Sequence, residues 1–420
     1  MSSTVVLAYS GGLDTTVAIP WLKEHGHEVV AVTVDVGQPG DLDTIRARAL
    51  AAGAKSAYLV DAKAEFADQF IARALKANAL YEGIYPLATA LARPLIGRHL
   101  VDVARRVGAQ KIAHGCTGKG NDQVRFDVCA ASLAPDLEVI APARVWKMTR
   151  DEEVAYAAAH RLPISVGVRS PFSFDENLWG RSAECGVLED PWVEPPEEAF
   201  GWTRPPEAAP DRAQTVTVGF EEGRPVSLDG ADDSLEAIVR TVNRIAGMHG
   251  VGRIDHLESR VVGIKSREVY ESPAAVTLIG AHRALEAMVL PRDLLATKQQ
   301  LEHRYAELIY DGLWYTPLRE AIDAFVESTQ ARVSGEVVVK FFKGSARVIG
   351  RRSPNSLYRH DLATYSHGDR FRAEMAEGFI YVWGLPARTW AGIDATASSP
   401  AVPAAPKSSG ARPRATPETP

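Results

Sequence analysis

Residues 5–16 read Val-Val-Leu-Ala-Tyr-Ser-Gly-Gly-Leu-Asp-Thr-Thr, and this stretch decides the fold. Its apolar start predicts a buried strand and its end predicts a helix, so the two glycines form a tight turn between them. Gly11 and Gly12 let the backbone approach a ligand, while the first N–H groups of the helix and nearby hydroxyls can bind an anion. The spacing matches neither the P-loop of kinases nor GxGxxG of classical dinucleotide-binding turns. We interpret the stretch as a phosphate-binding turn rather than an ordinary glycine turn with Ser and Asp caps.

The first third of the chain alternates short β-branched runs with longer helical patterns, which predicts βαβ units and a parallel sheet. Right-handed crossovers make this an open, doubly wound α/β sheet of five strands, for which we expect the order 3-2-1-4-5. Pro20 is expected to kink the first helix. The predicted strands are residues 5–8, 29–34, 57–60, 111–113 and 138–140, and the predicted helices are 14–25, 42–52, 63–76, 87–107, 121–133 and 150–160.

A second, α+β domain is predicted after Leu162, where prolines become frequent. We expect strands at residues 215–220 and 261–264, helices at 234–248, 285–310 and 317–328, and a hairpin of 336–342 with 346–350 around Lys343 and Gly344. The predicted division is a nucleotide-binding domain at 1–165, a synthetase and multimerisation domain at 166–365, a C-terminal arm at 366–394 and a disordered tail at 395–420.

Composition narrows the class of protein. With 46% hydrophobic and 24% charged residues the chain should be globular, and its net charge of -6 argues against a nucleic-acid partner. The three cysteines include no CxxC pair, which predicts neither a disulfide framework nor a cysteine zinc site. The sequence shows neither a signal-peptide pattern nor an apolar run of membrane-spanning length, so we expect a cytoplasmic protein without membrane contact.

A second glycine-rich loop follows the fourth predicted strand. Residues 114–126 read His-Gly-Cys-Thr-Gly-Lys-Gly-Asn-Asp-Gln-Val-Arg-Phe, in which Asn121 or Asp122 can cap the next helix and Arg125 lies one turn further. In the order 3-2-1-4-5 the ends of strands one and four adjoin, so both glycine loops should flank one crevice. Taken alone, the loop is equally consistent with a capped surface turn. It is no Walker loop, since Gly120 stands where Ser or Thr is needed.

These loops carry a resemblance to known families. Residues 10–15 resemble the SGGxDS/T pyrophosphate loop of ATP pyrophosphatases. Together with residues 85–94, Tyr-Pro-Leu-Ala-Thr-Ala-Leu-Ala-Arg-Pro, the two loops resemble argininosuccinate synthetases specifically. Further matches lie at residues 172–179, at Ser182, and at 250–255 and 265–273, so that the resemblance runs from about Val5 to Pro386.

The resemblance implies the roles of individual residues. Asp122 and Arg125 are the implied catalytic residues. Two departures stand out: Thr16 replaces a common Ser but keeps the hydroxyl, and Ala90 replaces a Ser, so that either Thr89 supplies the donor or one hydrogen bond is missing. Without the resemblance, Glu258 would be read as a solvated surface carboxylate and Tyr270 as a core or rim residue. The implied ATP site is Ala8, Tyr9, Ser10, Gly11, Gly12, Leu13, Asp14, Thr15, Thr16, Val34 and Gly115; the aspartate site is Thr117, Asn121 and Asp122; the citrulline site is Tyr85, Ala90, Asn121, Arg125, Ser173, Ser182, Glu258 and Tyr270.

The family's reaction is the implied function. ATP, carried as its Mg²⁺ complex, would activate L-citrulline as citrullyl-AMP with release of pyrophosphate, and L-aspartate would then displace AMP to give argininosuccinate, a step of arginine biosynthesis. The resemblance also implies a homotetramer without a tightly bound prosthetic group, and the sequence shows no dedicated protein metal cage.

Two alternatives use the same nucleotide domain. A tRNA-modifying ATP pyrophosphatase would need a basic face and a catalytic cysteine pair, which the sequence lacks. A nucleotide-binding sensor without turnover would not require Ser173, Ser182, Glu258 and Tyr270 to converge on the nucleotide crevice.

The tail yields the first prediction. Of residues 395–420, 20 of 26 are Ala, Pro, Ser or Thr, too few large apolar groups to offset the entropy of ordering. Deletion of residues 395–420 should therefore leave the melting temperature and turnover nearly unchanged. Dissociation of the expected tetramer on this deletion would show that the tail boundary is misplaced.

Overall fold

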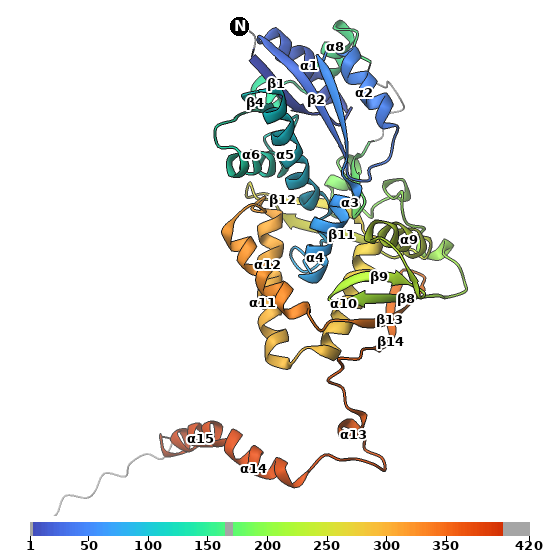
Figure 1. Cartoon of the computed structure of the whole chain (residues 1–420), viewed down its shortest axis with the longest axis vertical. Helices are drawn as coiled ribbons and strands as arrows, with labels where there is room; N and C mark the ends of the chain where they lie inside the picture. The colour runs from blue at the N-terminus through green and yellow to red at the C-terminus, as the bar shows by residue number, and fades with distance from the viewer. Residues whose placement is uncertain (1–2, 164–170, 398–420) are drawn as a thin grey trace, which may run out of the picture. The chain divides into compact units, whose positions relative to one another are not determined.

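The computed structural model describes residues 3–163 and 171–397 (Figure 1). They form two compact units, of which the first ends at Leu357 and the second begins at Tyr358. The first unit contains both glycine loops and every residue predicted to bind a substrate, so the candidate site belongs to that unit.

A five-stranded parallel sheet in the order β3-β2-β1-β4-β5 confirms the predicted fold class. Both faces of the sheet are buried, as expected for parallel strands covered by crossover helices. Along β1 the side chains alternate: Val5 and Leu7 pack in one hydrophobic cluster, and Val6 and Ala8 pack in another. The strands are β1 (Ser3–Ala8), β2 (His27–Asp35), β3 (Ser56–Asp61), β4 (Lys111–Ala113) and β5 (Glu138–Ile140).

Helices follow these strands close to the predicted positions. The predicted helix at 63–76 is one helical stretch that contains a π-helical segment, η1 (Phe66–Ile71). A capping box of Thr149 and Glu152 starts α8. The helices are α1 (Leu13–Glu24), α2 (Leu42–Ala51), α3 (Lys63–Glu65), α4 (Ala72–Lys76), α5 (Ala88–Val107), α6 (Asp122–Leu133), α7 (Pro142–Trp146) and α8 (Arg150–Ala159).

The second part of this unit contains two antiparallel sheets, in the orders β10-β9-β8-β13-β14 and β11-β12-β7-β6. The predicted strand at 215–220 and the predicted hairpin lie in the first of these sheets. Strands β6, β7, β9, β10, β11 and β12 were not predicted. The strands are β6 (Ser173–Asn177), β7 (Gly180–Glu184), β8 (Gln214–Glu221), β9 (Arg224–Leu228), β10 (Ala231–Asp232), β11 (Arg253–Ser259), β12 (Lys265–Glu271), β13 (Gly335–Phe342) and β14 (Ser345–Arg352).

Helices complete this part of the unit. Short 3-10 helices η2 (Gly186–Glu189), η3 (Glu197–Ala199) and η4 (Pro206–Ala208) punctuate the proline-rich segment after β7. The longer helices are α9 (Leu235–Met248), α10 (Pro273–Val289), α11 (Arg292–Tyr310) and α12 (Pro317–Gln330).

Two predicted elements were wrong. Residues 261–264 are not a strand: they form the turn between β11 and β12, with the side chains of Val262 and Ile264 exposed. The predicted helix at 285–310 is two helices, because Leu290 and Pro291 both adopt extended backbone angles between α10 and α11. Proline lacks the N–H that a continuous helix would need and disfavours a helical conformation in the residue before it.

The second unit contains α13 (His360–Ala363), α14 (Glu374–Trp383) and α15 (Leu385–Ala397). Its large apolar side chains are exposed, including Phe379 and Trp383, whose rings stack on each other. Because α15 continues to Ala397, the first three residues of the predicted tail are helical; residues 398–420 lie outside the described part. No helix among the described residues is both long and apolar enough to cross a membrane.

Close contact between α5 and α6 fixes the spacing of the polar residues that these helices carry. A Cβ atom at Gly97 of α5 would lie 2.5 Å from Sγ of Cys129 on α6. Substitution Gly97→Ala should therefore push the helices apart and destabilise the protein by about 1–3 kcal/mol, the usual cost of overpacking.

Urea unfolding of Gly97→Ala, Cys129→Ala and the double variant tests this contact. Removing Sγ relieves the clash, so the double variant should lose less stability than the two single losses added together. Strict additivity would show that the two residues do not limit the approach of the helices.

Candidate functional site

The carboxyl ends of the parallel strands open into a cavity of about 510 Å³. β1 and β4 are hydrogen-bonded neighbours, so the glycine turn after β1 and the loop after β4 line the same cavity, as the strand order predicted. Strand β6 of the second part adds a further wall with Phe174, Asp175 and Glu176. Of the residues predicted to bind ATP, all line the cavity except Gly11 and Thr16.

Hydrogen bonds to its carbonyl groups fix the conformation of the glycine turn after β1. Gly11 has φ +78°, and a Cβ there would lie 3.0 Å from Ile45, so the position requires glycine. The hydroxyl of buried Thr16 donates to the Gly12 carbonyl at 2.7 Å, and Arg48 donates to the Gly11 carbonyl at 2.7 Å. Gly11 and Thr16 therefore shape the turn.

The start of α1 offers its amide groups to a ligand. Gly12 occupies the N-cap position of α1, and no side chain caps this helix end. The first N–H groups of a helix lack internal partners and carry the positive end of its dipole, which suits phosphate oxygens. Ser10 and Thr15, whose hydroxyls lie 3.2 Å apart, line the cavity beside them.

A carboxyl group with a raised pKa lies behind the turn. Glu153 is buried on α8, which packs against α1, and burial together with the Asp14 carboxylate raises the pKa of Glu153 to about 8. Glu153 is therefore neutral at pH 7 and hydrogen-bonds to Asp14, a residue that lines the cavity. Of the two carboxyl groups of Asp14 and Glu153, the raised pKa of Glu153 therefore leaves only one charged at this side of the turn. An anionic ligand in the cavity is repelled less as a result.

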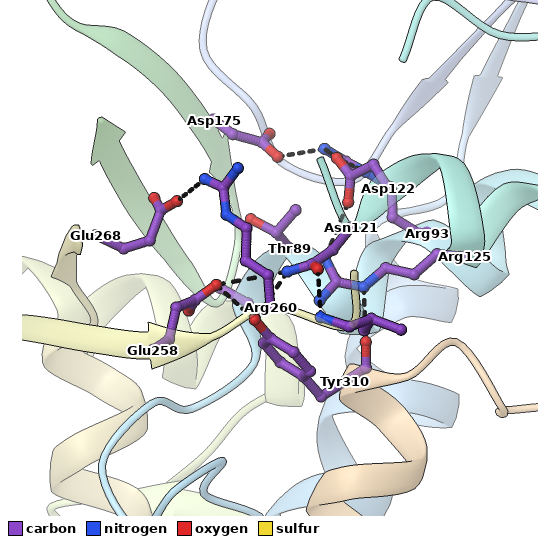
Figure 2. Close-up of polar contacts among 12 residues, drawn as sticks. Thr89, Arg93, Asn121, Asp122, Arg125, Asp175, Glu258, Arg260, Glu268 and Tyr310 are labelled. Atoms are coloured by element: carbon purple, nitrogen blue, oxygen red, sulfur yellow. Dashed lines mark hydrogen bonds and ion pairs between the residues drawn. The ribbon is translucent and has the colours of Figure 1, made fainter. Parts of the chain in front are cut away.

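Arg93 joins three elements at the edge of the cavity. Its guanidinium contacts Asp122 at the start of α6, at 2.7 Å, and Asp175 of β6 (Figure 2). Arg125, one turn along α6, contacts the other oxygen of Asp122 at 2.9 Å. Burial alone would raise the pKa of Asp122, but the two guanidinium groups outweigh it and hold that pKa below its usual value.

Asn121 does not cap α6 with its side chain, contrary to expectation. Its amide nitrogen donates to the hydroxyl of Tyr310 at 2.8 Å and to Glu258 at 3.4 Å, and its oxygen accepts from the Val261 backbone N–H at 2.9 Å (Figure 2). The side chain is thus used to hold the loop before α6 against the turn between β11 and β12.

Glu258 and Tyr270 belong to a second cluster of polar groups beside this amide. The carboxylate of Glu258 accepts from the hydroxyls of Tyr270 and Tyr310, each at 2.6 Å, and the ring of Tyr85 stacks on Tyr270 at 4.0 Å. Glu258 is 2% exposed, yet no Lys, Arg or His side chain of the described residues forms an ion pair with it. A buried carboxylate with only neutral donors is suited to a cationic ligand.

The remaining predicted residues lie in three settings. Ser182 of β7 lies opposite Tyr270 in the sheet register and therefore beside this cluster. Ala90 is fully buried, and the N–H of Thr89 donates to the hydroxyl of Tyr85. Thr117 and Ser173 are exposed, and the structure does not bring either of them into the polar network.

Four residues of this region were missed by sequence reasoning. Arg93 and Asp175 lay inside quoted motifs without a role, whereas Tyr310 and Arg260 carried no local signal. Arg260 contacts Glu184 and Glu268, each at 2.7 Å, and donates to the Lys119 carbonyl of the second glycine loop at 3.4 Å. It thus adds a further contact between this loop and the turn after β11.

Comparison with known proteins gives the family. The chain matches the model of the arginosuccinate synthase N-terminal HUP domain over residues 4–163 and that of the arginosuccinate synthase C-terminal domain over residues 172–390. An argininosuccinate synthase of Dehalococcoides mccartyi is 57% identical over 389 residues, or 92% of this chain and 96% of the relative. Those of Listeria monocytogenes and Oceanobacillus iheyensis are 55% and 53% identical over 93% of this chain and 96% and 94% of the relatives. The chain that builds this phosphate turn and this carboxylate cluster belongs to the argininosuccinate synthase family.

Proposed function

We propose that the chain catalyses the ATP-dependent ligation of L-citrulline and L-aspartate to argininosuccinate, with release of AMP and pyrophosphate. The observation that carries the proposal is the position of Asn121 and Asp122, two adjacent residues at the start of α6. Asp122 lines the phosphate cavity, and Asn121 contacts Glu258 in the second cluster. A nucleotide and an amino acid can therefore lie side by side.

ATP is assigned to the cavity. Its phosphates lie at the uncapped start of α1, with Ser10 and Thr15 as hydroxyl donors, and its base lies toward Val34. Mg²⁺ would be carried on the phosphates, where it would neutralise their charge, and Asp14, which lines the cavity beside the turn, would be the carboxylate that could contact it. Neutral Glu153 limits the repulsion between this part of the protein and the nucleotide.

Citrulline is assigned to the second cluster, beside Tyr85, Tyr270 and Glu258. Its ammonium group supplies the cation that buried Glu258 lacks. Ser182, which lies opposite Tyr270 in the sheet, and Arg125, whose guanidinium lies over the ring of Tyr310, are its further polar partners. Tyr310 adds a donor that keeps the carboxylate oriented. The ureido end of citrulline then points toward Asp122 and the phosphate cavity.

Aspartate is assigned to the second glycine loop, with Thr117 and Asn121 for its carboxylates and Asp122 for its amine. The ureido oxygen of citrulline attacks the α-phosphate to give citrullyl-AMP, pyrophosphate leaves, and the aspartate amine displaces AMP. The protein acts by placing reactants and balancing charge, which alone can lower a barrier by roughly 7–11 kcal/mol. Arg93 and Arg125 face the negative charge that accumulates beside Asp122.

Assembly and location follow the family. We expect a homotetramer in the cytoplasm, acting in arginine biosynthesis without nucleic acid or a membrane. The convergence of Glu258, Tyr270 and Ser182 beside the nucleotide cavity favours this ligase over a sensor without turnover. Ser173 was the fourth residue expected to converge on the nucleotide cavity with these three. It is exposed, so it would have to approach the other three residues when the substrates bind.

Glu258 supplies a direct test of the proposed citrulline site. Glu258→Gln keeps the side chain's size but removes the charge that would pair with the ammonium of citrulline. We expect citrulline binding to weaken by about 1.5–3 kcal/mol, the range for a hydrogen bond to a charged group, with little change for ATP. Equilibrium titration of each substrate measures both effects.

The matched control is Glu207→Gln, which makes the same change at an exposed position of η4. It should bind both substrates as the unmodified chain does. Equal weakening of ATP and citrulline by Glu258→Gln would instead indicate a structural role for the carboxylate.

An isotope experiment tests the chemistry. If the ureido oxygen attacks phosphorus directly, this oxygen must leave with AMP, so citrulline carrying a heavy ureido oxygen should label AMP and leave pyrophosphate unlabelled. Mass spectrometry of the products after one turnover decides the matter. Unlabelled AMP, or ADP as the nucleotide product, would contradict direct adenylation even with argininosuccinate formed.

A further inference from the structure

The side chain of Gln38 forms hydrogen bonds with two backbone groups at the end of β2. Its amide nitrogen donates to the Val34 carbonyl at 2.9 Å, and its amide oxygen accepts from the Val36 N–H at 2.8 Å. All three residues line the cavity assigned to ATP.

Strand geometry explains why these backbone groups face the cavity. The Val32 carbonyl accepts from Tyr9 N–H on the β1 side, whereas the Asp35 carbonyl accepts from Ala62 N–H on the β3 side. Because carbonyls alternate in direction along a strand, that of Val34 points to the β1 side. Because β1 ends at Ala8, the Val34 carbonyl faces the cavity instead of a backbone N–H of β1.

The backbone that presents these groups is fixed, whereas Gln38 holds them only through its flexible side chain. Asp35 accepts from Gly37 N–H at 2.9 Å, and Leu178 N–H donates to the Val36 carbonyl at 2.9 Å. Gly37 has φ +92°, and a Cβ there would lie 3.0 Å from Leu178. Gln38 can therefore leave by rotation about its side-chain bonds while Val34 and Val36 remain in place.

A carboxamide presents the same hydrogen-bond pattern as adenine. Gln38 offers an N–H donor next to an acceptor oxygen, and adenine offers its exocyclic N6 amino group next to an acceptor ring nitrogen. Guanine carries an acceptor oxygen at position 6, which would face the acceptor carbonyl of Val34.

We propose that Gln38 is an internal competitor for the base of the nucleotide: its carboxamide occupies the Val34 carbonyl and the Val36 amide in the free protein, and adenine binds by displacing it. The inference rests on the proposed use of ATP and adds the residue that sets base affinity, while the Val34 carbonyl and the Val36 N–H set the selectivity for adenine. A 6-oxopurine cannot take over the donor role of the carboxamide, so Gln38 stays and the base is rejected.

Calorimetric titration of the full chain tests this competition. Gln38→Met keeps the length of the side chain but lacks the amide, and Gln38→Ala serves as a second variant should the first fail to fold. In these variants adenine no longer has to displace the Gln38 carboxamide from the backbone. We therefore expect MgATP to bind roughly three- to tenfold more tightly, the factor that corresponds to one net hydrogen bond. Binding of inorganic tripolyphosphate, which has no base, should be unchanged.

The control is Gln300→Ala, at an exposed position of α11, which should bind both ligands as the unmodified chain does. Unchanged or weaker ATP binding by the Gln38 variants would overturn the proposal, as would an equal shift for tripolyphosphate. Failure of the unmodified chain to bind ATP would instead refute the proposed nucleotide site itself, so the two failures are distinguishable.

Discussion

The ion pairs of Arg93 are the interaction on which the arrangement of the site depends. One guanidinium joins α5, the start of α6 and β6, so it links the phosphate cavity to the second part of the first unit. The partial burial of Arg93 costs less free energy because its charge is paired with those of Asp122 and Asp175. Arg125 contributes the second positive charge that neutralises this pair of carboxylates. Asn121 and Arg260 also hold the loop before α6, and pairing with β7 holds β6. The ion pairs of Arg93 join these two walls of the cavity to each other.

Some of the buried and partly buried charged groups in the described part of the chain form ion pairs within the protein, whereas Glu258 does not. Arg93 and Arg260 each have two carboxylate partners within the protein. The charge of Glu258 is satisfied only by neutral hydroxyl and amide donors. A buried carboxylate in this state raises the energy of the protein, and a cationic group beside it lowers that energy, which is the basis for the proposed placement of the citrulline ammonium group.

Much of the nucleotide domain could be predicted from sequence because its signals are local. The turn at Gly11 and Gly12, the alternating strands and the strand order all follow from short-range patterns and handedness. The second cluster could be named only by resemblance, since Glu258 and Tyr270 meet through the register of β11 and β12. The β-branched residues that suggested a strand lie in the turn of this hairpin instead. Tyr310 had no signal, because one tyrosine at the end of a helix resembles any core residue.

The contacts that complete this cluster span long stretches of chain, which matters for how the protein is made. Asn121 reaches residues 137 and 189 positions further along, at Glu258 and Tyr310. During synthesis, the phosphate turn and Asp122 leave the ribosome well before either partner exists. The contacts of Asn121 with Glu258 and Tyr310 can therefore form only after one of the last helices of the first unit has been made.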